Sequence, residues 1–281
     1  MRVLPIVALQ LTSIVSGFPQ TPKNNVYEVY AIEYAAWNAH VPLKAVAVNA
    51  VSDDSITFSY YIWLLRGDNG RCVLVDTGFL EDTTGSRMHP PQYQRPDLAL
   101  QRIRVNAGDI TDVIITHPHH DHIGGLELFR KATIWMQQGD YAYFVGAAWQ
   151  QGADSRGLDK RDVLNTVQAN LDGRLRLVNG DSLEIIPGIR VFIGSKHTYE
   201  SQHLLVNTST ERVLIASDDS WFYYNFQNLL SVPLTFDTVA YVKQLRRMKT
   251  LVSNPDLVIP GHDALVLSKF PVVAKGVVRI R

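Results

Sequence analysis

The sequence predicts an α/β domain in which helices pack on mixed β-sheets, and three features of the chain lead to this class. First, short apolar segments rich in β-branched residues recur along the chain, bounded by Gly, Asn, Asp or Pro. Second, segments with helical spacing of apolar residues lie between some of them. Third, 46% of the residues are hydrophobic and 19% are charged, which is the balance of a folded globular protein.

The strands are predicted in the short apolar segments. β-Branched side chains favour extended backbone, and Gly and Pro interrupt it. In chain order, the predicted strands are residues 26–32, 45–51, 60–65, 72–76, 112–116, 132–136, 183–193, 203–207, 212–217 and 257–260.

Helices are predicted where apolar residues recur three or four positions apart, in residues 96–105, 160–171 and 237–252. In the last segment the repeat consists of Val239, Val242, Leu245 and Met248. Its basic residues gather near the C-terminal end, where the helix dipole favours positive charge. Because strands and helices are interleaved along the chain, we expect a layered domain.

The chain has 281 residues, enough for one large domain or two small ones. No Ser/Gly linker, internal repeat or change of composition marks a second folding unit, so residues 25–281 are predicted to form a single domain. The polar segment 81–95 contains Gly85, Pro90 and Pro91 and is interpreted as a long surface loop, of the kind that often serves as a lid.

Residues 1–20 are interpreted as a signal peptide or a disordered N-terminus. Arg2 precedes an apolar segment, and small residues follow it, as in secretory signals. Pro5, Gln10 and the single positive charge are unusual for such a signal. A signal peptide would make the protein secreted or periplasmic, and without one it would be cytoplasmic; the sequence leaves both open.

The charge balance excludes some classes of partner. Lys plus Arg and Asp plus Glu both number 27, so no net charge draws the protein to nucleic acid or to an anionic membrane. The single cysteine, Cys72, lies in an apolar segment, where we expect a buried thiol rather than a nucleophile. The expected partner is therefore a small molecule, and a homodimer is the one assembly that we keep open.

The most informative segment is residues 117–122, with the sequence HPHHDH, directly after a predicted strand. In extended backbone alternate side chains lie on one side, so His117 and His119 can face a common point, and the proline between them favours this backbone. Asp121 and His122 then come from the turn that leaves the strand. Imidazole nitrogen and carboxylate oxygen are ligands that zinc binds, so the segment predicts a metal site.

This segment resembles the signature of the metallo-β-lactamase superfamily. The resemblance implies an αββα sandwich, two mixed sheets flanked by helices, with metal ions in a groove along the sheet edges. Three further elements carry it, in the family's order, and it covers residues 59–263. The sequence GSKHT at 194–198 is similar to the family's Gly-His-Thr element, with Lys196 where glycine is usual. Asp218 follows an apolar strand, as the family's bridging aspartate does, and PGHD at 260–263 is similar to its final Gly-His-Asp.

The resemblance implies two Zn²⁺, or similar divalent transition-metal ions, per chain. The implied ligands are His117, His119 and His197 for one ion, Asp121, His122 and His262 for the other, and Asp218 as a bridge. Asp76 matches the family's carboxylate that orients a ligand histidine. The neighbouring Asp219 is not preferred as the bridge, because Asp218 follows the strand directly. Of the remaining histidines, His120 is expected to point away from the metals and His203 to begin a strand.

The layout is most like that of the N-acyl homoserine lactonases. A zinc ion lowers the pKa of its bound water to about 7, so a water shared by two such ions would be a hydroxide that can open an ester or lactone. Asp121 and Asp218 are assigned to this reaction as well as to the metals. Those lactonases carry a tyrosine shortly after the bridging aspartate, and Trp221 stands in its place here. We therefore predict Tyr223 as the residue that contacts the substrate carbonyl, with Tyr224 as its alternative; packing of residues 221–224 in the core is an equal alternative.

The resemblance also allows other functions on the same fold. A thioesterase of the glyoxalase II type and a phosphodiesterase are the enzymatic alternatives, and a metal-binding protein without catalysis is the third. The complete ligand set speaks against the third. The chain has no Gly-x-Ser-x-Gly motif that would supply a serine nucleophile, and its neutral charge disfavours nucleic-acid processing.

Overall fold

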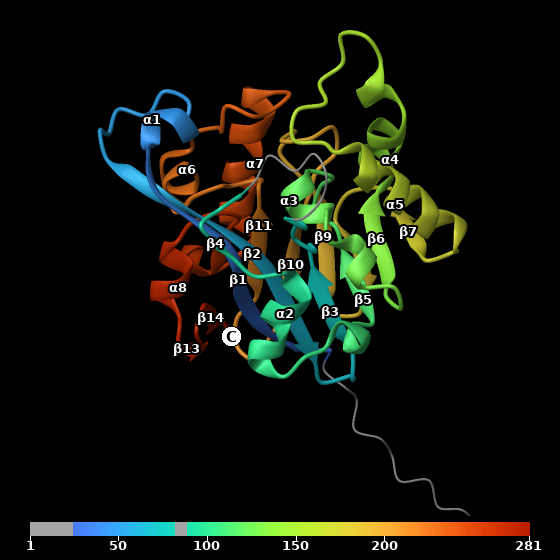
Figure 1. Cartoon of the computed structure of the whole chain (residues 1–281). Coiled ribbons are helices and arrows are strands. Elements are labelled where there is room, and N and C mark those ends of the chain that lie inside the picture. Colours follow the sequence, from blue (N-terminus) through green and yellow to red (C-terminus); the bar gives the residue numbers. More distant parts are fainter. Residues whose placement is uncertain (1–24, 82–88) are drawn as a thin grey trace, which may run out of the picture.

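The computed structural model describes residues 25–81 and 89–281. Two β-sheets pack face to face, and helices cover the outer face of each (Figure 1). This is the predicted αββα sandwich of mixed sheets, so the predicted fold class is confirmed. The predicted signal peptide or disordered segment, residues 1–20, lies outside the described residues.

In the described part of the chain, the first sheet has nine strands in the order β13-β14-β1-β2-β3-β5-β6-β7, and β4 pairs with β1. Strands β1, β2 and β3 are antiparallel, whereas β3, β5, β6 and β7 are parallel. The strands are β1 Tyr27–Pro42, β2 Ser55–Gly67, β3 Cys72–Val75, β4 Gln92–Tyr93, β5 Asp112–Ile114, β6 Thr133–Gln137, β7 Leu175–Val178, β13 Val272–Ala274 and β14 Val277–Arg279.

The second sheet has five strands within the described residues, in the order β12-β11-β10-β9-β8. Only β11 and β12 run parallel, so both end at the same edge of the sheet. The strands are β8 Leu183–Ile186, β9 Ile189–Ile193, β10 Gln202–Val206, β11 Val213–Ser217 and β12 Val258–Pro260.

The main core lies between the sheets. It consists of apolar side chains from the inner face of each sheet, among them Val29, Trp63, Val75, Val191, Leu204 and Ile215. Every residue of β11 is buried, because the first sheet covers one face of this strand and α7 (Thr238–Leu251) covers the other. Burial of these side chains, each worth about 1.5–3 kcal/mol, holds the layers together.

Helix α7 shows how the sequence sets a boundary and a buried face. The Asp237 carboxylate accepts hydrogen bonds from backbone N–H groups of the first turn, which otherwise lack partners. The helix buries Tyr241, Leu245 and Met248 against the second sheet. The predicted face is therefore partly wrong, because Val239 is 78% exposed and Tyr241 takes the inward position.

The remaining helices flank the sheets or connect strands. They are α1 Leu43–Val46, α2 Pro96–Leu100, α3 His120–Ile123, α4 Gln138–Val145, α5 Lys160–Leu171, α6 Tyr223–Asn228 and α8 Leu265–Lys269. Apolar side chains of α2, α4 and α5 pack in one cluster with the outer face of the first sheet. Among the described residues, no helix has the length and apolar character needed to cross a membrane.

Two predicted strands are wrong in detail. Residues 45–51 form the end of α1 and a turn, because Leu43 and Val46 pack against Phe222, and this packing outweighs the strand propensity of the valines. Residues 183–193 form two strands, β8 and β9, which turn at Gly188 with a positive φ of 84°. In the predicted loop 81–95, residues 82–88 lie outside the described residues, and part of the remainder forms β4.

Candidate metal centre

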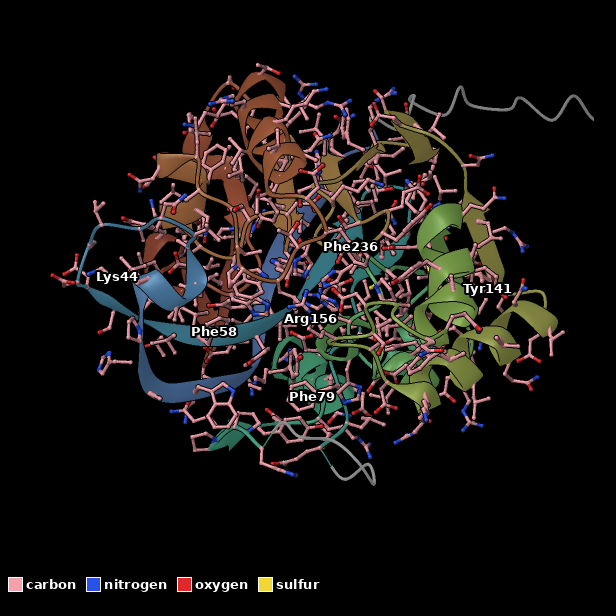
Figure 2. The ribbon with its side chains drawn as sticks, turned by 90° about the horizontal axis from the view of Figure 1, so that it is seen from above. Lys44, Phe58, Phe79, Tyr141, Arg156 and Phe236 are labelled. Atoms are coloured by element: carbon pink, nitrogen blue, oxygen red, sulfur yellow. The ribbon has the colours of Figure 1, made fainter. Side chains whose placement is uncertain are left out.

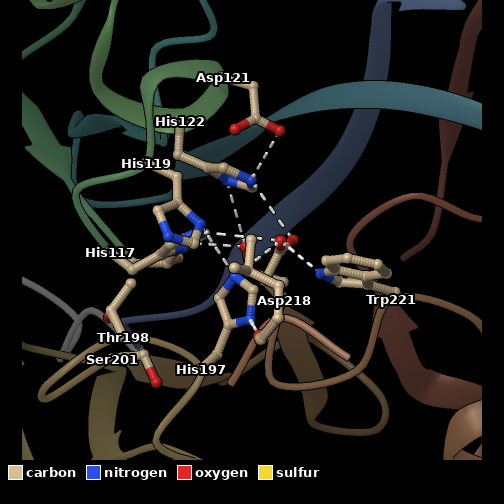
Figure 3. Close-up of polar contacts among 12 residues, drawn as sticks. His117, His119, Asp121, His122, His197, Thr198, Ser201, Asp218 and Trp221 are labelled. Atoms are coloured by element: carbon tan, nitrogen blue, oxygen red, sulfur yellow. Dashed lines mark hydrogen bonds and ion pairs between the residues drawn. The ribbon is translucent and has the colours of Figure 1, made fainter. Parts of the chain in front are cut away.

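The seven predicted ligands lie together where strands of both sheets end. Figure 3 labels six of them. The segment after β5 carries four of them, and the others follow β9, β11 and β12. A hydrogen bond of 3.0 Å between the hydroxyls of Thr116 and Ser217 joins the ends of β5 and β11 across the two sheets. Residues that are far apart in the sequence thus reach one point because their strands end there.

The ligands form two groups. In each group, one potential ligand atom per residue lies within 4.8 Å of all the others. The first group is His117, His119, His197 and Asp218, and the second is Asp121, His122 and His262. This division matches the predicted assignment to two ions.

The carboxylate of Asp218 lies between the two groups. Its Oδ2 is 3.1 Å from Nε2 of His197, in the first group. Its Oδ1 is 3.3 Å from Nε2 of His122 and 3.0 Å from Nε2 of His262, in the second. Oδ2 also lies 3.3 Å from Nε2 of His262, so the carboxylate contacts imidazoles of both groups, as a bridging ligand would.

Gly261 permits this approach. A Cβ at this position would collide with Oδ1 of Asp218, so a larger residue would push the carboxylate away from His262. Glycine is therefore required at this position of the Pro-Gly-His-Asp sequence, because it leaves room for the Asp218 carboxylate.

Three of the imidazoles are oriented by oxygen atoms outside the centre. Their Nδ1 atoms lie 2.8 Å from Oδ2 of Asp76 for His122, 2.7 Å from the carbonyl of Leu234 for His197, and 3.0 Å from the carbonyl of Ser59 for His262. Because these oxygens accept hydrogen bonds, the neutral rings carry their proton on Nδ1, and the Nε2 lone pairs face the centre. Such outer partners fix the tautomer that a metal needs.

Asp76 also joins the sheets at this point. Its carboxylate accepts hydrogen bonds from the backbone N–H and the hydroxyl of Thr116, both at 2.8 Å, and from the Ser217 hydroxyl at 3.2 Å. The Thr116 hydroxyl in turn lies 3.0 Å from Nδ1 of His117. These contacts support the predicted orienting role of Asp76, which the sequence suggested through the resemblance alone.

The two groups differ in charge. Burial, together with the neighbouring imidazoles, lowers the pKa of His117, and burial and His197 lower the pKa of His119 to about 3. Both rings are therefore neutral at pH 7 and ready to bind a cation. In the second group burial acts in the same sense, but the carboxylates outweigh it and raise the pKa of His122 and of His262.

The carboxylates are anionic. Burial alone would raise their pKa values, but the imidazoles of His122 and His262 outweigh it, so the pKa of both Asp121 and Asp218 lies below its ordinary value.

Asp121 is the most exposed of the seven predicted ligands. Its side chain is 16% exposed, so among these ligands it lies nearest the solvent from which a substrate would enter.

The side chains fit a pair of metal ions. Nδ1 of His119 lies 3.1 Å from Nε2 of His117 and 3.0 Å from Nε2 of His197, so nitrogen lone pairs converge where only a proton or a cation relieves their repulsion. Among the described residues, Nε2 of His122 and Oδ1 of Asp218 are buried without a hydrogen-bond partner. Buried polar atoms are normally satisfied, and a donor set of imidazole and carboxylate suits zinc or a similar transition metal.

A family model described as the metallo-beta-lactamase superfamily matches residues 53–262. The chain belongs to this superfamily. The predicted family is confirmed, and with it the expectation of a metal-dependent hydrolase.

Several relatives that this chain resembles are lactonases, and a shorter match of 74 residues, 32% identical, is a hydroxyacylglutathione hydrolase of Pseudomonas savastanoi that covers 26% of this chain and 23% of the relative. The N-acyl homoserine lactonase of Bacillus cereus is 26% identical over 239 residues, which cover 79% of this chain and 88% of the relative. The solved structure of a quorum-quenching N-acyl homoserine lactone hydrolase matches with a TM-score of 0.70 and 22% identity, over 89% of this chain and 98% of the other. The dizinc quorum-quenching lactonase AidC matches with a TM-score of 0.64 and 14% identity, over 85% and 91% of the two chains. These two structural likenesses show the shared fold.

Lys196 departs from the glycine expected in this superfamily. Its backbone has a φ of 62°, in the left-handed region that favours glycine, which explains why glycine suits this position. The lysine ammonium donates a hydrogen bond of 2.6 Å to the carbonyl of Tyr199 and lies over the Tyr199 ring.

Trp221 replaces the expected tyrosine and lies in the centre. Its indole Nε1 donates a hydrogen bond of 2.6 Å to Oδ2 of Asp218 (Figure 3). Its ring packs edge-on against His197 and His262, at centroid distances of 5.8 and 6.0 Å. The indole N–H can only donate, so Trp221 positions the Asp218 carboxylate. Because tryptophan has no hydroxyl, it cannot take the role of the expected tyrosine.

The prediction that Tyr223 takes this role is not supported by the geometry. Its side chain is 4% exposed and packs in the core between the sheets, with the ammonium of Lys269 4.7 Å from its ring centroid. The backbone turns it inward because Tyr223 begins α6, and its N–H donates to the Asp263 carboxylate. The alternative, Tyr224, packs beside α1 in a separate apolar cluster.

A buried polar network behind the centre was missed by the sequence analysis. Asp219 accepts hydrogen bonds from the Ser195 N–H and hydroxyl, at 2.9 and 2.6 Å, from the Ser201 hydroxyl at 2.7 Å, and from Nδ1 of His203 at 2.9 Å. It thereby fixes both ends of the loop that carries His197. The only signals in the sequence were a second aspartate after Asp218 and an unassigned histidine.

His120 points away from both groups, in the direction that we expected. Its Nδ1 lies 2.7 Å from Oδ2 of Asp162 on α5. The pair ties α3, which carries Asp121 and His122, to the outer helix layer.

Proposed function

We propose that the protein is a dinuclear zinc hydrolase that opens an ester or lactone, with N-acyl homoserine lactones as the first substrates to test. The observation that carries the proposal is the position of the Asp218 carboxylate between the two groups of candidate ligands, in contact with His197 of the first group and His262 of the second. The lactonase relatives support the choice of substrate, because they match most of the chain.

When bound, two such ions supply a hydroxide at neutral pH and polarise the bond that it attacks. The chain's own residues prepare the site. Asp76 and the carbonyls of Leu234 and Ser59 hold the imidazole protons on the far side of the rings, and Trp221 holds the Asp218 carboxylate. Because the lining is buried and already hydrogen-bonded, little reorganisation is needed during the reaction.

Apolar side chains beside the centre suit an acyl chain. A cavity of about 310 Å³ is lined by Trp37, Ala39, Val41, Phe58 and Tyr60. The Phe58 ring lies 5.3 Å from the His262 ring, so this cavity adjoins the second group of ligands. In Figure 2, Phe58 lies on the same side of the molecule as Lys44 and on the opposite side from Tyr141. Substrate pockets are mostly apolar with a few polar anchors, as here.

The first experiment is metal analysis of the purified full chain, for which we expect two zinc ions per chain. A pH-stat assay then compares N-acyl homoserine lactones with thioesters and phosphodiesters. Lactone hydrolysis no faster than in a chelator-treated sample, with rapid turnover of a thioester or phosphodiester, would replace the lactonase proposal with one of those activities. Absence of bound metal after growth and purification with zinc would remove the hydrolase proposal altogether.

Asp218→Ala tests the bridge. We expect this variant to lose metal and rate together, because both groups lose a shared ligand. Asp53→Ala is the matched control, since the side chain of Asp53 is 90% exposed and its ion pair within the described part of the chain is with Lys44 on the surface. An Asp218→Ala protein that kept two metals and full activity would show that the bridge is misassigned.

A further inference from the structure

The proposed reaction needs a hydrogen-bond donor to the substrate, and the position expected to provide it is filled by Trp221. The indole N–H of Trp221 is already donated to Asp218, and the hydroxyl of Tyr223 lies in the core. Tyr34, another tyrosine near the centre, donates its hydroxyl to the backbone carbonyl of Asp121 at 2.8 Å. A different side chain must therefore face the substrate.

Tyr60, on β2, has the right place. Its ring packs edge-on against His262, with a centroid distance of 5.1 Å and an interplanar angle of 72°. The same ring lines the apolar cavity next to Trp37 and Phe58, so it stands where that cavity meets the second group of ligands. Tyr60 is largely buried, and it is a wall of that cavity, so a molecule that fills the cavity contacts it.

The hydroxyl of Tyr60 is set up to donate. Nε1 of Trp37 donates a hydrogen bond of 3.2 Å to the phenol oxygen. An indole cannot accept, so this contact fixes the phenol oxygen as the acceptor and leaves its own proton free. Among the described residues, no acceptor for that proton is present in hydrogen-bond range.

A phenol keeps its proton at neutral pH, because its ordinary pKa is about 10. The Tyr60 hydroxyl, whose oxygen already accepts from Trp37, can therefore donate that proton to a substrate oxygen.

We propose that the Tyr60 hydroxyl donates a hydrogen bond to the substrate oxygen that lies on the Asp121, His122 and His262 side of the centre, with the apolar part of the substrate in the adjoining cavity. This proposal rests on the proposed function. It assigns to β2 the donor role that the superfamily resemblance placed after Asp218, and it makes Tyr60 a catalytic residue in a place where the sequence offered no motif.

The test is Tyr60→Phe, which removes one oxygen and keeps the ring packing on His262. Tyr61→Phe is the matched control, because Tyr61 is the next residue on the same strand, its ring faces the core between the sheets, and its hydroxyl donates to the Asp263 carbonyl. Metal content and thermal unfolding are measured for both variants, and we expect both to keep the metal content of the wild type.

For N-hexanoyl-L-homoserine lactone, we expect Tyr60→Phe to lower kcat/KM by about 10–100-fold, the scale of losing one preorganised donor, and Tyr61→Phe to change it less than threefold. Calorimetry with the ring-opened product, N-hexanoyl-L-homoserine, gives a readout that does not depend on turnover. We expect the affinity of Tyr60→Phe for this product to fall about tenfold, whereas a purely structural role would leave it unchanged in a protein with its full metal content.

Trp37→Phe is a second variant, in which the phenol loses its orienting partner. We expect a loss in the same two measurements, smaller than that of Tyr60→Phe. Wild-type kinetics and wild-type product affinity in a fully metal-loaded Tyr60→Phe protein would overturn the role of Tyr60. A wild-type protein that binds two metals but opens no lactone or ester would instead overturn the proposed function, whatever the variants do.

Discussion

The clearest perturbation of the centre is Asp76→Asn. Asp76 contacts no metal in the proposed arrangement, and it accepts the Nδ1 proton of His122 at 2.8 Å. It also has a positive φ of 59°, a conformation that asparagine tolerates better than most residues. The substitution thus keeps the size and the backbone of the residue and changes only one acceptor oxygen into an N–H₂ group.

The magnitude follows from the hydrogen bonds. The amide oxygen can still accept the Thr116 N–H, but the amide nitrogen then faces the protonated Nδ1 of His122, donor against donor. His122 must either lose a hydrogen bond to a charged group, worth about 1.5–3 kcal/mol, or move its proton to Nε2, where it blocks the metal. At about 1.4 kcal/mol per factor of ten, we expect affinity for the second ion to fall about 10–100-fold, the range typical of such outer partners.

The assay is competition for zinc against a chelator of known affinity, with metal counted per chain. We expect Asp76→Asn to keep one ion tightly and to release the other at a lower chelator concentration than the wild type. Asp112→Asn is the control, since Asp112 is also a buried carboxylate but pairs with Arg71 at the start of β5, away from the centre. Equal affinity of the wild type and Asp76→Asn for both ions would refute this account of His122 orientation.

Three further outcomes follow from the charges and contacts. Because burial raises the pKa of Asp140 to about 7, the folded metal-free protein retains a proton that the unfolded chain releases near pH 4. Its free energy of unfolding should therefore fall as the pH rises from about 4 to about 7, by up to about 4 kcal/mol, and urea titrations of Asp140→Asn should lack that contribution. Because the pKa values of His122 and His262 are raised in the absence of metal, binding of the second ion must release protons. Metal counts should thus drop from two towards one as the pH is lowered below neutral, and simultaneous loss of both ions would contradict this order. Asp219→Ala should lower zinc affinity through the loop that it anchors, and Asp53→Ala should not; an Asp219→Ala protein with unchanged metal affinity would show that the loop holds its shape without that carboxylate.

The candidate ligands could be predicted because they follow strands in a dense local pattern. The segment 117–122 concentrates four histidines and one aspartate in six positions, and the family order then points to His197, Asp218 and His262. The structure brings all seven predicted ligands to one point. The partners that orient these imidazoles were harder to predict from the sequence. Two of them are the backbone carbonyls of Leu234 and Ser59, and any residue type provides such a carbonyl.

The errors in the fold share a physical cause. Residues 45–51 contain three valines and predict a strand by local propensity, but contacts with distant residues decide their conformation. The same holds for Tyr223, whose position in the sequence suggested the centre and whose helix turns it into the core. Strands β13 and β14, which extend the first sheet beside β1, were not predicted, because their short segments lie beyond the region covered by the family motifs.

The ligands come from both sheets, and this has a consequence for how the molecule opens. His117 and Asp121 follow a strand of the first sheet, whereas His197 and Asp218 follow strands of the second. Two bound cations would thus crosslink the halves of the sandwich at one rim, much as a disulfide joins distant parts of a chain. Chelation should therefore loosen that rim first, and faster amide exchange after EDTA treatment should begin at the carboxyl ends of β5 and β11 while the opposite rim stays protected.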